Sequence, residues 1–322
     1  MERSSPVYQA YVKILERELV PAMGCTEPIA IAYCAAVARS VLGEIPDRIH
    51  VEASGNIIKN VKSVVVPNTG GRRGMETAAA IGVLGGDESA KLEVIAHVSQ
   101  EAKDRLERYL QETRITVGAA QTDHVLDIEV TVSKGDSRAV VRAVNEHTNL
   151  VYIENDGQVL EERPIEKQED PDAPDYTLLN VADICEFART CDLSDVSAIL
   201  DRQIACNTAV AEEGLRGNYG ANVGSTLLKA YGTDIKIRAK ARAAAGSDAR
   251  MSGCELPVVI NSGSGNQGLT VSLPVIEYAQ QLGADQETLY TALLISNLLS
   301  IHIKRHIGVL SAFCGAVSAA AG

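Results

Sequence analysis

Aromatic residues are scarce in this sequence: only 4% of its 322 residues are aromatic, with two Phe and no Trp. Hydrophobic residues still make up 46%, so the chain can bury a sizeable core, which excludes a mostly disordered protein. This core has to be built from Ala, Val, Ile and Leu. Such small side chains suit closely approaching helices better than an aromatic-filled β-sandwich.

Basic runs and long apolar runs are missing as well. The 30 Lys and Arg residues face 42 Asp and Glu, which gives a net charge of −12, and no basic run is longer than Arg72-Arg73 or Lys304-Arg305. Because a chain this acidic repels phosphate backbones, we expect no nucleic-acid partner. The uncharged stretches 288–303 and 306–322 are each shorter than the ~18–20 residues of a membrane span, so we expect no membrane partner either.

An export signal is not indicated, because the N-terminus has no apolar signal core. The seven cysteines are an odd number, which favours free thiols in a reducing environment over a disulfide framework. We therefore expect a cytoplasmic protein. Its length is that of one large domain or two ordinary ones.

The spacing of apolar residues predicts an α+β protein with a mixed α/β segment and a predominantly helical domain. We expect N-terminal helices within residues 1–45 that pack on the helical domain, an α/β domain over 46–160, an acidic linker over 161–175, and a helical catalytic domain over 176–322. The last run stays apolar and uncharged up to Gly322, from which we expect the helical domain to be incomplete.

The expected elements follow from these patterns. Helices are expected over 6–20, 26–42, 75–84 and 100–111, strands over 48–53, 92–97, 114–117, 125–132, 139–144 and 150–154, and a hairpin turn at Asn155-Asp156-Gly157. In the helical domain, helices are expected over 177–190, 194–216, 222–231, 234–250, 269–282, 286–303 and 306–322.

The segment Gly24-Cys25-Thr26-Glu27-Pro28 places a thiol just before a predicted helix. The unpaired N–H groups and the dipole at a helix start stabilise a thiolate, which can act as a base, a nucleophile or a metal ligand. A small buried residue that packs at a helix start is the alternative interpretation. Local sequence does not decide between them.

Two glycine- and asparagine-rich segments are candidates for binding a small anion. The first comprises 55–60 and 67–74 and contains Asn56, Thr69 and Gly70. Backbone N–H groups, hydroxyls and a cation before a helix suit a carboxylate, whereas a glycine-rich surface turn is the alternative interpretation.

The second segment, 261–268, follows a strand-like stretch over 256–260 and contains Ser262, Ser264, Asn266 and Gln267. Its glycines satisfy the G-x-G-x-x-G pattern, but a dinucleotide fold needs a strand near 285–300, where the sequence predicts a helix. A loop that closes on a small polar ligand fits better.

Five motifs occur in order along nearly the whole chain: PAMGCTEP (21–28), GNIIKN (55–60), PNTGGRRG (67–74), NSGSGNQG (261–268) and IGVLSAFCGAV (307–317). In this order they resemble the L-cysteine desulfidase family, which is related to the alpha domain of iron–sulfur L-serine dehydratases. The resemblance implies a lyase that uses no PLP and converts L-cysteine to pyruvate, ammonia and sulfide with a 4Fe-4S cluster.

By position, the resemblance makes Cys25 the catalytic base and Cys314 one of three cysteines that bind the cluster. The other two ligands are expected beyond residue 322, so this chain by itself is expected to be apo and inactive. The substrate would be oriented by the side chains and backbone of Asn56, Thr69, Gly70, Ser262, Ser264, Asn266 and Gln267.

Three alternatives to the desulfidase remain open. An L-serine (hydroxy-amino acid) dehydratase would use the same scaffold, a dinucleotide-dependent oxidoreductase would bind NAD at 263–268, and a non-catalytic protein would bind a small molecule without turnover. For the lyases, the expected partner is a small amino-acid substrate. A homo-oligomer is compatible with the sequence, which does not fix the oligomeric state.

Overall fold

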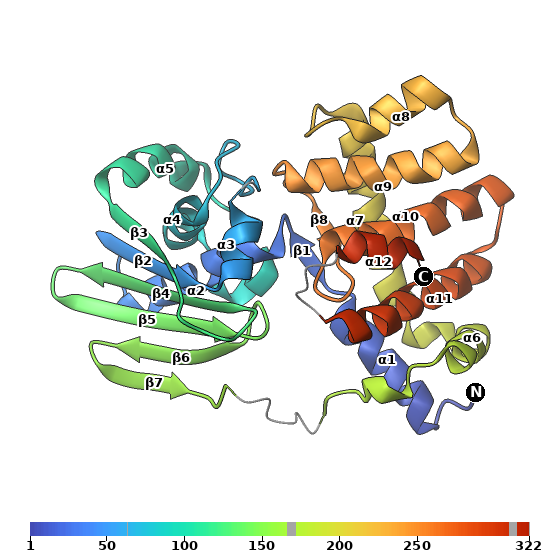
Figure 1. The fold of residues 1–322 in the computed structure, drawn as a ribbon, viewed down its shortest axis with the longest axis horizontal. Coiled ribbons are helices and arrows are strands. Elements are labelled where there is room, and N and C mark those ends of the chain that lie inside the picture. The colour runs from blue at the N-terminus through green and yellow to red at the C-terminus, as the bar shows by residue number, and fades with distance from the viewer. Residues whose placement is uncertain (63, 166–171, 309–313, 322) are drawn as a thin grey trace. The chain divides into compact units, whose positions relative to one another are not determined.

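The computed structural model describes residues 1–62, 64–165, 172–308 and 314–321. The chain forms two compact units: unit 1 consists of Met1–Ala22 and Asp170–Gly322, and unit 2 of Met23–Glu169. Unit 2 holds a mixed sheet with helices and unit 1 is mostly helical, so the predicted α+β class is confirmed (Figure 1).

Unit 2 is built on a six-stranded sheet with the strand order β3-β2-β4-β5-β6-β7. The strands are β2 (Arg48–Ala53), β3 (Arg114–Ala119), β4 (Asp127–Lys134), β5 (Ser137–Val144), β6 (Leu150–Asn155) and β7 (Gln158–Glu162). Strands β2 and β3 are parallel, and each of the other neighbouring pairs is antiparallel. The predicted hairpin joins β6 to β7, where Asp156 and Gly157 have φ of 50° and 84°, as a type I′ turn requires.

The helices of unit 2 are α2 (Thr26–Leu42), α3 (Gly55–Val61), α4 (Met75–Gly85) and α5 (Gln100–Glu112), with a 3₁₀ helix at Glu88–Glu93. Helix α2 packs against β4, β5 and α4. The two helices approach closely at Gly82, where an added Cβ would lie 2.3 Å from the Ala32 carbonyl oxygen. The small side chains of this core therefore serve the close helix contact that the composition predicts.

Unit 1 is formed largely by helices. They are α1 (Pro6–Glu18), α6 (Val181–Thr190), α7 (Ser197–Arg216), α8 (Val223–Tyr231), α9 (Ile235–Met251), α10 (Gly265–Leu282), α11 (Gln286–Ile307) and α12 (Gly315–Ala321), with 3₁₀ helices at Tyr176–Leu178 and Leu193–Asp195. Strands β1 (Pro21–Met23) and β8 (Pro257–Val259) form a two-stranded sheet. Helices α1, α6 and α11 share one apolar core, and α9 packs on α7, α8 and α10.

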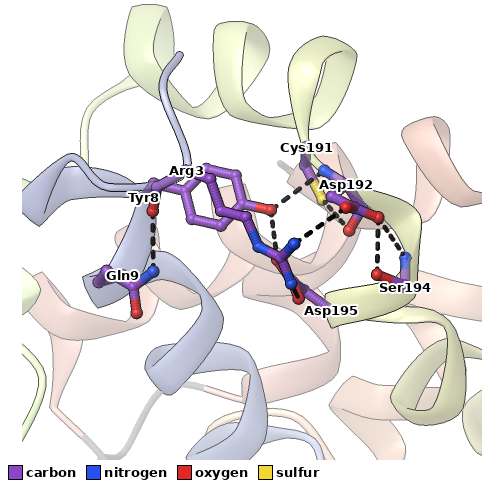
Figure 2. Close-up of polar contacts among 7 residues, drawn as sticks. All are labelled: Arg3, Tyr8, Gln9, Cys191, Asp192, Ser194 and Asp195. Atoms are coloured by element: carbon purple, nitrogen blue, oxygen red, sulfur yellow. Dashed lines mark hydrogen bonds and ion pairs between the residues drawn. The ribbon is translucent and has the colours of Figure 1, made fainter.

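Within unit 1, helix α1 and the residues before it make polar contacts with residues far along the chain (Figure 2). The Tyr8 hydroxyl donates to Asp195 (2.6 Å) and accepts from the backbone N–H of Asp192 (3.0 Å). Arg3 pairs with both carboxylates. Burial, together with the Asp195 carboxylate, raises the pKa of Tyr8 above its ordinary value, so the phenol stays a neutral donor.

The two N-terminal helices belong to different units. We expected residues 1–45 to pack together on the helical domain. Helix α1 does lie in unit 1, but α2 covers β4 and β5 in unit 2. The physical reason is that α2 is buried nearly all around from Thr26 to Ala36, so it needs both a sheet and a second helix to cover it.

Two local predictions were wrong. Residues 92–97 form turns at the end of a 3₁₀ helix instead of a strand, although Val94 and Ile95 are buried there. Residues 55–60, interpreted as a loop, form most of helix α3, which begins after Ser54. Both segments are short, and burial of a few apolar side chains does not require a partner strand.

Parts of two predictions lie outside the described residues. These are residues 166–171 of the expected linker, and residues 309–313 and 322 of the last expected helix. Helix α11 continues to Ile307, and α12 starts at Gly315. Among the described helices, none combines the length and the apolar character that a membrane crossing needs.

Candidate functional site

Cys25 lies at the N-cap of α2, directly before the first helical residue, Thr26, and is buried. Gly24 holds the chain in this position with φ of 63°, a conformation that favours glycine. A Cβ added at Gly24 would lie 2.5 Å from Cγ of Pro67, so the 21–28 and 67–74 motifs are in direct contact. The structure thus brings together two of the motifs of unit 2.

The Cys25 thiol has a buried carboxylate as its neighbour. Cys25 Sγ donates to Oε2 of Glu27 at 2.8 Å, and the hydroxyl of Thr26 donates to the same oxygen at 3.2 Å. Asn60 Nδ2 donates to Oε1 of Glu27 at 2.9 Å, so the 55–60 motif joins the site. Glu27 is only 8% exposed and lies in the first turn of α2, where the helix dipole favours a negative charge.

This arrangement gives the thiol proton an acceptor. The Cys25 side chain makes no capping hydrogen bond to α2, and it lies at the helix start, where the helix dipole favours a negative charge. Together, carboxylate and helix start allow Cys25 to lose its proton and to accept another. Sequence reasoning missed the roles of Glu27 and Asn60 in this site. The available signal was Glu27 itself, a charged residue at the start of an otherwise apolar helix.

The first predicted loop is held largely by internal hydrogen bonds. The Thr69 hydroxyl donates to the carbonyl of Val66 at 2.6 Å, and Asn68 Nδ2 donates to the carbonyl of Ile95 at 2.7 Å. Asn56 and Gly70 are exposed, Asn56 on the first turn of α3. Of the residues of this unit that were predicted to contact the substrate, Asn56 and Gly70 are thus the two that a ligand can reach from solvent.

The second predicted loop, 261–268, makes its contacts within unit 1. Ser264 is the N-cap of α10 and accepts from the N–H of Gln267. Asn266 Oδ1 accepts from Arg250 Nη1 at 3.0 Å. The Ser262 hydroxyl donates to Asn261 Oδ1 at 3.0 Å, and Gln267 Nε2 donates to the same oxygen at 2.8 Å.

This loop continues into a buried amide network that sequence reasoning missed. Asn297 Nδ2 donates to Gln203 Oε1 at 2.8 Å, while Asn297 Oδ1 accepts from Gln203 and from Asn261, both at 3.0 Å. Gln267 Nε2 also donates to the Ser300 hydroxyl at 2.9 Å. These side chains are fully buried and link α7, the loop, α10 and α11. These hydrogen bonds fix the position of the loop, although one amide oxygen, Gln267 Oε1, stays unpaired among the described residues.

Cys314 lies in unit 1, directly before α12, and is exposed. A Cβ added at the next residue, Gly315, would lie 2.6 Å from Gln267 Oε1, so Cys314 is held beside the 261–268 loop. Gln267 Oε1 is buried without a hydrogen-bond partner among the described residues. Burial lowers the pKa of Lys304 from its ordinary value, and the nearby Cys314 acts in the opposite direction.

The described residues do not form a complete cluster site. In residues 1–62, 64–165, 172–308 and 314–321, no three His, Cys, Asp or Glu side chains gather where they could hold a metal ion. Cys314 is the candidate thiolate ligand there, and residues 309–313 of its motif lie outside the description. The described thiols therefore fit at most one position of the expected ligand set.

Both units carry sequence features of an enzyme family of the lyase class. Residues 89–322 match the family model described as serine dehydratase alpha chain, and the chain belongs to this family. The match confirms the expected relation to the alpha domain of serine dehydratases.

Longer relatives of the chain are UPF0597 proteins. One from Desulfitobacterium hafniense is 54% identical over 327 residues, covering 100% of this chain and 75% of the relative. One from Lachnoclostridium phytofermentans is 54% identical over 316 residues, covering 98% and 76%. One from Treponema denticola is 46% identical over 320 residues, covering 98% and 74%.

Proposed function

We propose that the protein is a β-elimination lyase that converts L-cysteine and water to pyruvate, ammonia and sulfide. The observation that carries the proposal is the hydrogen bond from the buried Cys25 thiol to the buried Glu27 carboxylate at 2.8 Å. Such a pair can move a proton, and a β-elimination begins by removing one from carbon. Membership of the serine dehydratase alpha chain family supports this class of reaction.

In this proposal Cys25 is the base. Glu27 accepts the thiol proton, and the start of α2 stabilises the thiolate that remains. The thiolate removes the α-proton of the substrate, whose C–H electron pair becomes the Cα–Cβ double bond. The Cβ–S bond breaks with its electron pair and releases HS⁻, which leaves as H₂S after taking up a proton. The resulting 2-aminoacrylate rearranges to an imine, which water hydrolyses to pyruvate and ammonia.

Substrate orientation is assigned to the predicted contacts. Asn56 and Gly70 are the exposed members in unit 2. The remaining predicted substrate contacts also stay in the proposal, and each is positioned by hydrogen bonds within the protein. They are Thr69, Ser262, Ser264, Asn266 and Gln267.

The proposal retains a 4Fe-4S cluster with Cys314 as one ligand. Because the described residues do not supply a complete ligand set, we assign the cluster no step. Its presence is measured by iron content and visible absorption after anaerobic supply of iron and sulfide, with Cys314→Ala beside the wild type. Equal iron content in both would remove Cys314 from the ligand set.

L-Serine is the second candidate substrate, because the matching family model is described as a serine dehydratase. The same proton removal would then expel the hydroxyl, which leaves as water. If L-serine is turned over much faster than L-cysteine, L-serine becomes the first candidate substrate, and the proposed role of Cys25 is unchanged.

The test is an anaerobic assay of sulfide and pyruvate released from L-cysteine, with the wild type, Cys25→Ala and Cys34→Ala. We expect Cys25→Ala to lower kcat by about 100- to 10,000-fold, the usual contribution of a general base. Cys34, buried in the same helix, is the matched control, since burial raises its pKa to about 12 and keeps it a thiol at neutral pH.

The control separates a lost base from a damaged helix. Full activity of Cys25→Ala would contradict the proposed base, and an equal loss in both variants would assign the effect to packing of α2. If the chain is inactive with either substrate while the longer Desulfitobacterium relative is active, the same variants are compared in that relative. Inactivity of both proteins would overturn the proposal.

A further inference from the structure

The sheet of unit 2 carries a basic pocket on the face opposite its helices. Along β2, residues 49, 51 and 53 are buried toward the helices, and the alternating residues 48, 50 and 52 point to the other face. A pocket of about 460 Å³ opens there over β2, β3, β4 and β5. It lies entirely in unit 2, and neither Cys25 nor Glu27 lines it.

Three arginines line one end of this pocket. Arg114 of β3 is the direct partner of Arg48 of β2 in the parallel pair. On the other side of β2, Arg48 faces Ser133 of β4, and Ser133 in turn faces Arg138 of β5. The row therefore runs Arg114, Arg48, Ser133, Arg138 over four strands. Like charges placed side by side on a sheet repel each other, so this row costs stability unless a negative charge offsets it.

Carboxylates of the protein offset the row only in part. Arg138 Nη2 pairs with Glu154 Oε1 at 2.9 Å, and Arg48 Nε lies 3.5 Å from Asp47 Oδ1. Arg114 is exposed and has no ion pair or side-chain hydrogen bond among the described residues. Asp136 is the acidic residue in the lining. A basic pocket is unexpected in a chain with a net charge of −12.

The next row of the same face carries two hydroxyl groups, which can donate hydrogen bonds. Thr116 faces His50, which faces Thr131 across β4. His50 Nδ1 lies 2.8 Å from the Thr116 hydroxyl, and His50 Nε2 lies 3.3 Å from Glu52 Oε1, which fixes the ring. Guanidinium groups beside hydroxyls are the usual donors to phosphate and carboxylate oxygens.

We propose that this pocket binds a compact multivalent anion, either a phosphate-bearing molecule or a polycarboxylate. Three guanidinium groups in one row call for more than one negative charge, and the pocket of about 460 Å³ has room for a small ligand. The site is separate from the Cys25 site, and it does not depend on the proposed lyase activity.

The test is calorimetric titration of the full chain with pyrophosphate and, separately, with citrate, for the wild type, Arg114→Gln and Arg108→Gln. Arg108 is the matched control, because it is an exposed arginine of the same unit that pairs with Glu112 on α5. We expect Arg114→Gln to weaken binding of the preferred anion about tenfold or more and Arg108→Gln to leave it unchanged. Stronger binding of pyrophosphate would identify a phosphate ligand, and stronger binding of citrate a polycarboxylate.

Thermal melting provides an independent readout. Without ligand, Arg114→Gln should melt at or slightly above the wild-type temperature, since one repelling charge is removed. With ligand, the wild type and Arg108→Gln should gain stability and Arg114→Gln should gain much less. Absence of binding by the wild type, or equal binding by both variants, would overturn the proposal.

Discussion

Two sites of the molecule, one in each unit, differ in the kind of polar group that they bury. In unit 1, the loop at 261–268 joins Gln203 and Asn297 in a network of amides and hydroxyls. In unit 2, the start of α2 buries a thiol against a carboxylate. The first set does not titrate at physiological pH, whereas the second can exchange a proton. The Gly-, Ser- and Asn-rich motif at 261–268 is thus held by amides and hydroxyls, whereas the motif at 21–28 holds the thiol and the carboxylate.

The largest expected effect tests whether the unit 1 network is scaffold. Asn297→Ala removes hydrogen bonds to Gln203 and Asn261 and leaves buried partners unsatisfied, so we expect a loss of about 2–4 kcal/mol of unfolding free energy. Denaturant titration measures it, with the exposed Asn218→Ala as control, which should change stability by less than about 0.5 kcal/mol.

Because the network holds no titratable group, the Asn297→Ala loss should be the same at pH 6 and pH 8. A stability close to that of the wild type would show that the loop is not held by this network. The interpretation of the unit 1 network as a structural scaffold would then be wrong.

A smaller effect tests whether the unit 2 site is reactive. Glu27→Gln removes the acceptor for the Cys25 proton, and we expect kcat to fall about 10- to 100-fold, the equivalent of one hydrogen bond to a charged group. The rate of the variant should rise with pH as the unaided thiol ionises. Glu101→Gln, which also lies in the first turn of a helix of unit 2, is the control.

If Glu27→Gln lowers stability and leaves kcat and its pH profile unchanged, Glu27 is a structural cap of α2. Unit 2 would then bury its carboxylate for the same reason that unit 1 buries its amides.

The smallest expected effect concerns Glu129, on the outer face of the sheet next to Arg142. Burial raises the pKa of Glu129, so its folded-state pKa lies above its unfolded one. The contribution of Glu129 to stability is therefore full below the unfolded pKa and is lost as the pH rises through the folded pKa. At pH 7, Glu129→Gln should be more stable than the wild type by less than about 1 kcal/mol, and urea titration should show no difference near pH 4. A constant difference across this pH range would contradict the assigned cause.

Local patterns were sufficient for much of the fold. The bounds of β2 and α2 and the turn at Asn155–Gly157 follow from alternation, helical spacing and turn chemistry, and the structure confirms them. The error at 92–97 arose because the buried Val94 and Ile95 look like part of a strand, while their backbone pairs with no strand among the described residues.

The polar partners were beyond such reasoning. Asn60 reaches Glu27 from 33 positions along the chain, and Asn297 reaches Gln203 from 94. A single sequence contains no signal for contacts of this range, because they depend on how the helices pack. Sequence reasoning therefore proposed Cys25 and missed the carboxylate two residues away that accepts a hydrogen bond from its thiol.

During synthesis on the ribosome, helix α1 is made long before the residues that it contacts. Tyr8 bonds to Asp195, 187 residues later, so α1 emerges without most of its partners. At 5–20 residues per second, this wait is roughly 10–40 s. Residues 23–169 leave the ribosome in that interval and contain all strands of their own sheet. The inserted unit can therefore fold while the earlier helix still has its apolar face uncovered, which leaves α1 exposed to aggregation or to binding by a chaperone during that time.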